Sequence, residues 1–541
     1  MLSLSHIPVE FHASLSAHIE RWQDSADTTQ QQRLQQCLSQ FPQLAQQLPR
    51  VWVLSEFITR YGLDQTDEFL TCLESGLWNQ ALNITEWQAL LTEQCSDARD
   101  ALDEQAFSRS LRIFRRRMMF RIVWRDLCRL DSMSATVEDM SILADSVIQA
   151  AISFFYAMFE ARWGKPIGKY SGDEQPLVVL GMGKLGGREL NVSSDIDLIF
   201  AYPEGGVTSG GRKSISNHEF FLKLCQKIIQ SIDTVTGDGF VFRVDMRLRP
   251  YGQSGALALN FDAMEEYYQT QGREWERYAM IKARVVSGDA SFGGIVAGEQ
   301  LMTLLQPFVY RRYLDYSAID SMRDMKALIN REVQRKGMSG DVKLGSGGIR
   351  EIEFVVQVFQ LIRGGRDHRL RERQVLKLLP LLETEQLLPV GTSKLLASAY
   401  VFLRNTEHAI QGYQDKQTQS LPFDELSCQR LAWAMGFVIW DDFFTELEQH
   451  RGHVRESFNK VISTHESNDP DSSEQVQWRD WSHIWSDDVE PTVLQQSLIA
   501  MGLDEPESVA KILLDLKISR AVVAMQPEGR KRLDALMPRL L

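Results

Sequence analysis

Two aspartates, Asp195 and Asp197, stand two positions apart in a short apolar run that ends at Phe200. If this run is a strand, residues two apart point to the same face, so both carboxylates reach one spot. Two neighbouring negative charges are costly to bury unless cations neutralise them. Divalent ions held by carboxylates, with nucleotide phosphates completing the shell, meet that need, so the pair predicts a metal-dependent site for phosphoryl chemistry.

A third carboxylate, Asp245, lies in residues 240–248, where polar and apolar residues alternate. The alternation predicts a strand with one polar face made of Arg243, Asp245, Arg247 and Arg249. One acid among three arginines suits a metal ion together with phosphate oxygens. A solvated edge-strand face with internal ion pairs is the alternative interpretation.

A glycine-rich turn, GMGKLGG at residues 181–187, precedes the aspartate pair. It fits neither the P-loop consensus nor the dinucleotide-binding fingerprint. Its backbone amides and its lysine are nevertheless candidates to bind anionic oxygens. The residues that we expect to bind substrate or phosphate are Gly183, Lys184, Gly186, Gly187, Ser194, Arg247, Arg249 and Arg350.

A second glycine motif, GSGGIREIEF, begins at residue 345, and a helix is expected to open near Ile349. Glu351 and Glu353 would then lie about 200° apart around the helix and cannot both face one metal. The glutamates either complement the helix dipole, or one of them orders Arg350 or Lys343 beside the nucleotide. Other residues that are candidates to line the cleft are Glu274, Trp275, Arg277 and Lys282; the tryptophan either stacks on adenine or belongs to the core.

Five segments, taken in order, resemble one family. They are GMGKLGGRELNVSSDIDLIF, RVDMRLRPYGQSGAL, REWERYAMIKARVVSGD, FVYRRYLDY and GSGGIREIEFVVQ. The first, a small-residue turn before an acidic-x-acidic strand, resembles the active site of the polymerase-beta-like nucleotidyltransferases. Together the five resemble the glutamine synthetase adenylyltransferases, bifunctional enzymes that add AMP to glutamine synthetase and remove it. The resemblance runs from about residue 20 to the end, and it includes one copy of the motif where the family has two. The wording of that copy is similar to the adenylyl-removing one, so the chain looks like the N-terminal part of a longer protein.

The resemblance implies that inorganic phosphate attacks the AMP linked to a tyrosine of glutamine synthetase and releases ADP. Asp195, Asp197 and Asp245 would be the catalytic residues and would hold two Mg²⁺ ions, with Mn²⁺ also acceptable to oxygen ligands. Glutamine synthetase would be the protein substrate, and a PII-type signalling protein would stimulate the removal. Two alternatives stay open: transfer of AMP from ATP onto the tyrosine at the same type of site, and a non-catalytic nucleotide-sensing module.

The composition of the 541-residue chain is ordinary for a globular protein, with 44% hydrophobic and 24% charged residues. A net charge of −13 argues against broad nucleic-acid binding, which needs a clustered basic surface. No uninterrupted apolar stretch approaches the length of a membrane span, so we expect a cytoplasmic protein without membrane association. Its six cysteines lack metal-ligand spacing and are expected to be reduced and buried.

Eight arginines crowd into residues 109–129, and apolar residues recur among them at helical spacing. The pattern predicts an amphipathic helix with a basic face. That face either docks an acidic partner or pairs with acidic neighbours in its own fold, and the second interpretation is favoured.

The candidate residues must be positioned by helices and strands. The order of the expected elements predicts a fold of the α+β class that is predominantly helical. A small mixed sheet of the polymerase-beta-like type is embedded between helical domains. Helices are expected at residues 137–163 and 218–234, strands at 176–181, from 196 and at 240–248, and a glycine-rich loop at 203–213. The expected domains are an N-terminal helical segment (1–130), the catalytic domain (131–290), a helical bundle completing the cleft (291–465), and a linker with the start of a regulatory helical region (466–541).

Overall fold

A computed structural model describes residues 6–291, 293–311, 340–467 and 506–519, together with residues 4, 494, 498, 522 and 533. Contacts divide the chain into two units, Met1–Phe458 and Asn459–Leu541. The domain boundaries expected at residues 130, 290 and 465 stay predictions. Most of the expected linker at 465–474 lies outside the described residues, and so do residues 312–316 of the motif FVYRRYLDY.

Helices fill the described chain from residue 12 to residue 163. They are α1 (His12–Ser25), α2 (Thr28–Gln40), α3 (Leu44–Leu54), α4 (Glu56–Asp64), α5 (Thr66–Glu74), α6 (Ile84–Asp100), α7 (Glu104–Leu127) and α8 (Met133–Trp163). Asp27 and Asn83 form capping boxes with Gln30 and Glu86 and so satisfy amide groups at the starts of α2 and α6. Helix α8 ends at Gly164, whose φ of 80° is a conformation that glycine adopts without strain.

Helix α8 forms part of the core of the first unit. In the described chain it is the one helix that is long and apolar enough, by composition, to cross a membrane, and 67% of its most apolar window is buried inside the fold. It packs against α6, α7 and α10 (Asn217–Asp233), and Phe154 stacks on Phe107 with 4.0 Å between ring centroids. The sequence analysis saw no apolar stretch of this length because polar residues such as Asp145 interrupt the run, and Asp145 is ion-paired with Arg284 at 2.9 Å.

The arginine-rich segment is helix α7, and its arginines pair within the fold. The close ion pairs are Arg115–Asp415, Arg116–Glu68, Arg121–Asp139 and Arg125–Asp131, each at 2.5–2.6 Å. Arg112 instead donates to the backbone oxygens of Thr234 and Gly239. The interpretation of a basic helix paired with acidic neighbours of its own fold is therefore confirmed.

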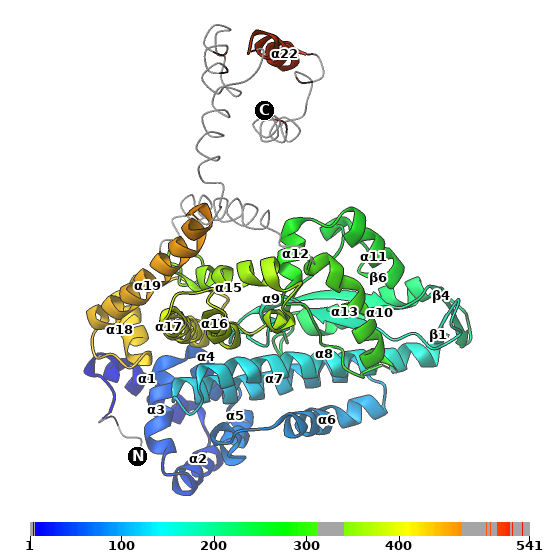
Figure 1. Ribbon diagram of the computed structural model, residues 1–541. Helices are drawn as coiled ribbons and strands as arrows, with labels where there is room; N and C mark the ends of the chain where they lie inside the picture. The colour runs from blue at the N-terminus through cyan, green and yellow to red at the C-terminus, as the bar shows by residue number, and fades with distance from the viewer. Residues whose placement is uncertain are drawn as a thin grey trace. The chain divides into compact units, whose positions relative to one another are not determined.

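The aspartate pair lies in a sheet of five strands: β2 (Val178–Gly181), β3 (Asp195–Tyr202), β5 (Arg243–Asp245), β6 (Ala258–Asn260) and β7 (Arg284–Val285). Strand β3 is antiparallel to β2 on one side and parallel to β5 and β6 on the other, and β7 pairs antiparallel with β2. Helix α10 packs against β5 and β6, and α13 (Gly294–Val309) packs against β2 and β7 (Figure 1). The predicted class, a predominantly helical α+β fold with a small mixed sheet, is confirmed.

The strand expected over residues 240–248 is shorter than predicted, because β5 covers only Arg243–Asp245. Past Asp197 the edge of β3 is occupied by β6, so β5 has no partner along which to continue. The chain turns at once, and the N–H of Arg247 donates to Oδ1 of Asp245 at 2.8 Å. The prediction that Arg243, Asp245, Arg247 and Arg249 alternate on one strand face is therefore wrong beyond Asp245.

The predicted helices at 137–163 and 218–234 are α8 and α10, each displaced by a few residues at its start. The glycine-rich segment at 203–213, expected to be a loop, contains β4 (Gly206–Gly210), which pairs antiparallel with β1 (Gly164–Gly168). Glycine composition hid this strand, since glycine is uncommon in strand interiors. The six cysteines are free thiols, and four of them are buried.

Further helices complete the two units. They are α9 (Gly183–Gly186), α11 (Phe261–Thr270), α12 (Glu274–Met280), α15 (Ile349–Arg363), α16 (Val375–Thr384), α17 (Thr392–Gln414), α18 (Glu425–Ala434), α19 (Trp440–Ser467) and α22 (Pro506–Ile518). Helix α15 begins at Ile349, as the glycine motif before it predicts. Helix α17 is buried among α3, α4, α7, α8, α15 and α16, so it links the N-terminal helices to the helices that follow the sheet.

Candidate active site

Strands β3 and β5 bring the three aspartates together. In the parallel register Asp197 is opposite Asp245, and Asp195 is opposite Arg243. Burial, followed by the negative charges of Asp195 and Asp245, raises the pKa of Asp197 to about 7. The charges of Asp195 and Asp245 therefore act on Asp197, as the sequence reasoning expects, and a nearby positive charge would favour the ionised form of Asp197.

Two polar side chains bind the outer aspartates. Nε2 of Gln417 donates to Oδ1 of Asp195 at 2.8 Å, and Nε of Arg247 donates to both carboxylate oxygens of Asp245 at 3.0 and 2.7 Å. Burial alone would raise the pKa of Asp245, but the hydrogen bonds from Arg247 lower it on balance. Arg247 itself stays largely exposed, with 71% of its side chain accessible.

The donor set suits a hard divalent cation by its chemistry, because it consists of three carboxylates on two adjacent strands. In the part of the chain that the structure describes, no three or more His, Cys, Asp or Glu side chains are close enough together to hold a metal ion as they stand. At this site the carboxylate of Asp245 is bound by Arg247. Metal binding by Asp195, Asp197 and Asp245 stays a prediction that rests on the donor chemistry and on the raised pKa of Asp197.

The glycine turn between β2 and β3 is packed against the aspartates. The N–H of Met182 donates to the backbone oxygen of Asp197 at 2.9 Å. Gly183 has a φ of +51°, and a side chain there would come within 3.2 Å of Oδ2 of Asp197. At Gly186 an added Cβ would lie 1.9 Å from the backbone oxygen of Lys282, so no other residue fits without moving the backbone.

Two further candidates for phosphate binding are Gly187, in the glycine turn, and Ser194, just before β3. Gly187 follows α9, and a Cβ there would come within 3.1 Å of Oε2 of Glu189. Ser194 directly precedes β3 and is half-buried. Their binding of phosphate stays a prediction.

Lys184, expected to bind an anion, is already ion-paired in the structure. Its Nζ lies 3.1 and 3.2 Å from the two carboxylate oxygens of Glu407, a fully buried residue of α17. Burial lowers the pKa of Lys184 to about 7 in spite of this partner. Burial would raise the pKa of Glu407, but the charges of Lys184 and Arg404 lower it on balance.

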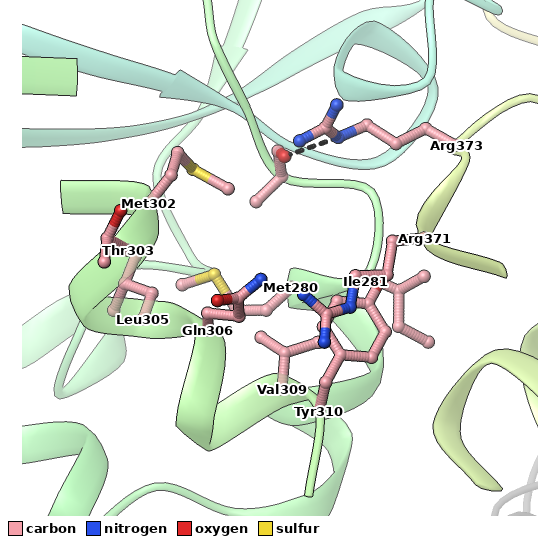
Figure 2. A pocket seen from close by; sticks show the side chains of 11 residues that line it. Met280, Ile281, Met302, Thr303, Leu305, Gln306, Val309, Tyr310, Arg371 and Arg373 are labelled. Atoms are coloured by element: carbon pink, nitrogen blue, oxygen red, sulfur yellow. Dashed lines mark hydrogen bonds between the residues drawn. The ribbon is translucent and has the colours of Figure 1, made fainter. Parts of the chain in front are cut away.

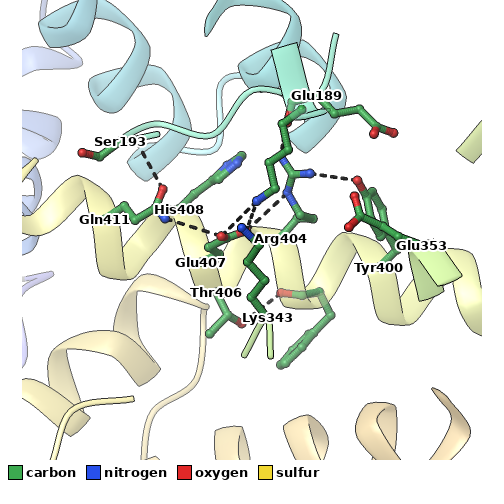
Figure 3. A network of polar contacts seen from close by, with 12 residues as sticks. Glu189, Ser193, Lys343, Glu353, Tyr400, Arg404, Thr406, Glu407, His408 and Gln411 are labelled. Carbon is green, nitrogen blue, oxygen red and sulfur yellow. Dashed lines mark hydrogen bonds and ion pairs between the residues drawn. The ribbon is translucent and has the colours of Figure 1, made fainter. Parts of the chain in front are cut away.

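Sequence reasoning missed the polar face of α17 that supports the site (Figure 3). Arg404 donates to the backbone oxygen of Glu189 at 2.6 Å, and Oε1 of Gln411 accepts from the N–H of Ser193 at 3.2 Å. The hydroxyl of Ser193 in turn accepts from Arg243 at 3.0 Å. These bonds fix the segment that leads into β3. The signal for them was available, because Arg404, Glu407, His408 and Gln411 recur at helical spacing along this helix.

Lys282 joins the glycine turn to the second glycine motif. Its Nζ lies 2.8 Å from Oε2 of Glu189 and 2.8 Å from Oε1 of Glu353, and all three side chains are largely buried. Burial would raise the pKa of Glu353, but the charge of Lys282 and its neighbours lowers it to about 2. Glu351 instead accepts a bond from the N–H of Gly347 at 3.2 Å, at the start of α15. Both glutamates therefore have structural partners, and they face different groups.

Of the two cations near this motif, Lys343 is the one whose charge reaches the aspartates, since it counters the raised pKa of Asp197. Oδ1 of Asp341 holds it in place by accepting from the N–H of Lys343 at 2.8 Å. Arg350 is half-buried on the first turn of α15, and its charge acts on the pKa of Tyr278. The charge of Lys343 therefore acts on the aspartate site, whereas the binding of phosphate by Arg350 stays a prediction.

The remaining candidates serve the local fold. Arg249 donates to the backbone oxygens of Met246, Gln253 and Gly255 at 2.7–3.1 Å and so holds the turn after β5. Arg277 is fully buried and donates to the backbone oxygen of Val309 at 3.0 Å. Trp275 is 42% exposed, so of the two interpretations left open for it the one that places it in the core is wrong, and stacking on adenine stays a prediction.

Comparisons with known proteins agree with the motifs. Residues 45–297 match the family model described as glutamate-ammonia ligase adenylyltransferase, and residues 323–462 match the one described as GlnD PII-uridylyltransferase. A protein of Hahella chejuensis is 48% identical over 93% of this chain and 51% of its own length. Proteins of Pseudomonas aeruginosa and Pseudomonas putida are 47% and 46% identical over 91% and 92% of this chain, and over 49% and 50% of their own lengths. Each is named bifunctional glutamine synthetase adenylyltransferase/adenylyl-removing enzyme. The chain spans about half the length of these curated relatives.

Proposed function

The chain belongs, through residues 45–297, to the glutamate-ammonia ligase adenylyltransferase family, and from this premise we propose that it removes AMP from adenylylated glutamine synthetase. In the proposed reaction an oxygen of inorganic phosphate attacks the phosphorus of the AMP group. The bond from that phosphorus to the tyrosine oxygen breaks, the tyrosine regains a proton, and the new phosphoanhydride leaves as ADP. Phosphate is already a nucleophile, so no side-chain nucleophile is required.

The observation that carries the proposal is the register of β3 against β5, which sets Asp197 opposite Asp245 with Asp195 on the same strand. Burial, together with the negative charges of Asp195 and Asp245, raises the pKa of Asp197 to about 7, as expected for a site adapted to cations. Asp195, Asp197 and Asp245 would hold Mg²⁺ or Mn²⁺. The metal would supply charge neutralisation on the attacking and leaving oxygens.

The side chains around the aspartates supply the rest of the proposed chemistry. Gln417 orients the carboxylate of Asp195 through its 2.8 Å hydrogen bond. Arg247, exposed over most of its length, and Lys343, whose charge reaches Asp197, are the cations placed to bind phosphate oxygens. Lys184 has a structural role in this proposal, because its ion pair with Glu407 connects the glycine turn to α17.

The direction of transfer rests on the wording of the motif, which is similar to the adenylyl-removing copy of the family. The same aspartates would serve the opposite reaction, in which AMP moves from ATP to the tyrosine. We propose glutamine synthetase as the substrate because the relatives' names include it. A PII-type protein is the proposed regulator, supported by the match of residues 323–462 to a PII-modifying family.

The test is to incubate the chain with adenylylated glutamine synthetase, Mg²⁺ and phosphate, with and without a uridylylated PII-type protein, and to identify the released nucleotide. We expect ADP that depends on phosphate and that disappears in Asp195→Asn. The matched control is Asp173→Asn, which changes an exposed aspartate in the turn before β2 and should leave the rate unchanged.

Each other outcome identifies an alternative. Transfer of AMP from ATP onto unmodified glutamine synthetase, without release of ADP from the adenylylated form, would reverse the assigned direction. Release of AMP without phosphate would mean hydrolysis. Nucleotide binding with no turnover in either direction would favour a sensing module.

A further inference from the structure

A cavity of about 190 Å³ lies away from the aspartates, between the end of α12, the last turns of α13, and residues 371–373 (Figure 2). One wall is apolar and is formed by Met280, Ile281, Met302, Leu305 and Val309. The lining residues with polar side chains are Thr303, Gln306, Tyr310 and two arginines, which bring two guanidinium groups. Among the described residues that line the cavity there is no aspartate or glutamate.

The two guanidinium groups belong to Arg371 and Arg373, and each is fixed by one backbone contact. Nε of Arg371 donates to the oxygen of Gly364 at 2.7 Å, and Nε of Arg373 donates to the oxygen of Ala283 at 2.8 Å. Arg371 also lies over the ring of Tyr310, 5.0 Å from its centroid. Anchoring through Nε leaves the terminal nitrogens of both side chains at the cavity (Figure 2).

Neither guanidinium is ion-paired with a carboxylate in the part of the chain that the structure describes. Glu372, between them in sequence, turns its carboxylate to the backbone N–H groups of Arg373 and Gln374, at 2.6 and 3.1 Å. Burial lowers the pKa of both arginines, which remain charged at neutral pH. The charge of Glu372 acts on Arg373, but its carboxylate contacts backbone N–H groups and not the guanidinium, so an anion in the cavity would be a favourable direct partner for both arginines.

We propose that this cavity binds a small organic anion: its carboxylate or phosphate group contacts Arg371 and Arg373, and its short apolar body packs against the methionine-lined wall. The apolar wall distinguishes the site from a simple phosphate or chloride site, because inorganic anions gain nothing from it. The proposal rests on the cavity alone and is independent of the proposed deadenylylation.

The cavity lies beside the chain segment that contacts the glycine turn. Met280, Ile281 and Ala283 line the cavity, whereas Lys282 between them binds Glu189 and Glu353 on the opposite side. The backbone oxygen of Lys282 is the atom against which Gly186 packs. A ligand in the cavity would therefore touch the segment against which the glycine turn packs.

The experiment measures binding to the full chain by isothermal titration calorimetry at constant ionic strength. The two probes are pentanoate and butyl phosphate, which share a four-carbon apolar body and differ in the anionic group; hexanoate, one carbon longer, is measured beside them. Acetate supplies the charge with almost no body, and hexanol supplies the body without the charge. We expect at least one of the two probes to bind with a millimolar or lower Kd, and acetate and hexanol to bind at least about tenfold more weakly. Which probe binds more tightly identifies the natural ligand as a carboxylate or a phosphate ester.

Three variants locate the binding. Arg371→Gln and Arg373→Gln should each weaken it by at least about tenfold. Arg369→Gln is the matched control, because Arg369 is 60% exposed on the same short helix, η4 (His368–Arg371), and is paired with Asp367 and Glu385. It should leave binding unchanged.

Met302→Trp fills the cavity without altering charge and should also abolish binding, with circular dichroism melting used to verify that each variant folds. The proposal is overturned if neither probe binds at millimolar concentration, if hexanol binds as tightly as hexanoate, or if Arg369→Gln weakens binding as much as Arg371→Gln does.

Discussion

Replacing Glu407 by glutamine tests whether α17 stabilises the site through buried charge. The side chain of Glu407 is fully buried and lies 3.1 Å from Nζ of Lys184. It also lies 3.6 Å from Nε of Arg404 (Figure 3). Glutamine keeps the size of the side chain and removes its charge. The substitution leaves two buried cations without their shared carboxylate.

The expected cost follows from which cation can lose its charge. Removing one partner of a buried ion pair typically costs about 3–5 kcal/mol, because the other charge stays buried and uncompensated. Lys184 can release its proton, since its pKa is already about 7, whereas a guanidinium cannot. Arg404 keeps its hydrogen bonds to the hydroxyl of Tyr400 at 2.8 Å and to the backbone oxygen of Glu189 at 2.6 Å. We therefore expect a loss near the lower end of that range, about 3 kcal/mol at pH 7.

The assay is urea unfolding followed by tryptophan fluorescence, with the free energy of unfolding obtained from the midpoint and slope. Glu219→Gln is the control: Glu219 and Lys223 form an exposed pair 3.6 Å apart, and its loss should cost about 0.5 kcal/mol or less. The double variant Glu407→Gln with Lys184→Met should recover part of the loss, since one uncompensated cation is gone. A loss below about 1 kcal/mol for Glu407→Gln would refute the argument that this carboxylate holds two buried cations.

Three further outcomes are expected. Gly186→Ala would place a Cβ 1.9 Å from a backbone oxygen, so thermal melting should show a destabilisation of about 1–3 kcal/mol or more. Gly205→Ala is the control: an added Cβ there has nothing within 4 Å, so the stability should hardly change. Lys184 has a pKa of about 7 in the folded chain and near 10.5 when unfolded, so between pH 7 and 9 the unfolded chain binds more protons and stability rises with pH. The free energy of unfolding, measured by urea titration, should therefore increase by about 2 kcal/mol over this pH range, and the increase should be absent in Lys184→Met. An equal pH dependence in the unsubstituted chain and in Lys184→Met would contradict this prediction. Gln417→Ala frees the carboxylate of Asp195, so the Mg²⁺ concentration for half-maximal deadenylylation should increase about tenfold or more; an unchanged Mg²⁺ titration would exclude an orienting role.

Local patterns were sufficient to predict the elements around the aspartates. Alternation and spacing placed Asp195 and Asp197 on one strand, which the structure describes as β3, and glycine punctuation placed the start of α15 at Ile349. Helical periodicity found α8 and α10 to within a few residues at their starts. These features depend on residues close in sequence, so a short window contains the information.

The predictions that were wrong concern places where a distant segment of the chain decides the local structure. Strand β5 ends at Asp245 because β6 pairs with the remainder of β3, and β4 forms in a glycine-rich segment because β1 pairs with it. Arg249 shares no strand face with Asp245 because the chain turns after β5, and backbone oxygens of that turn occupy its guanidinium. Trp275 lies in the short helix α12, and the residues of that helix do not show by themselves which of its side chains are exposed.

The sequence by itself determined the family, the helical α+β class and the acid pair on β3, since these follow from residue types at fixed short spacings. Only the tertiary structure decided what the charged groups around that pair contact. Lys184 and Glu407 are 223 positions apart, and Asp195 and Gln417 are 222 positions apart. A charge excluded from water must find its counter-charge or hydrogen-bond partner wherever folding brings one, and no local pattern specifies that partner.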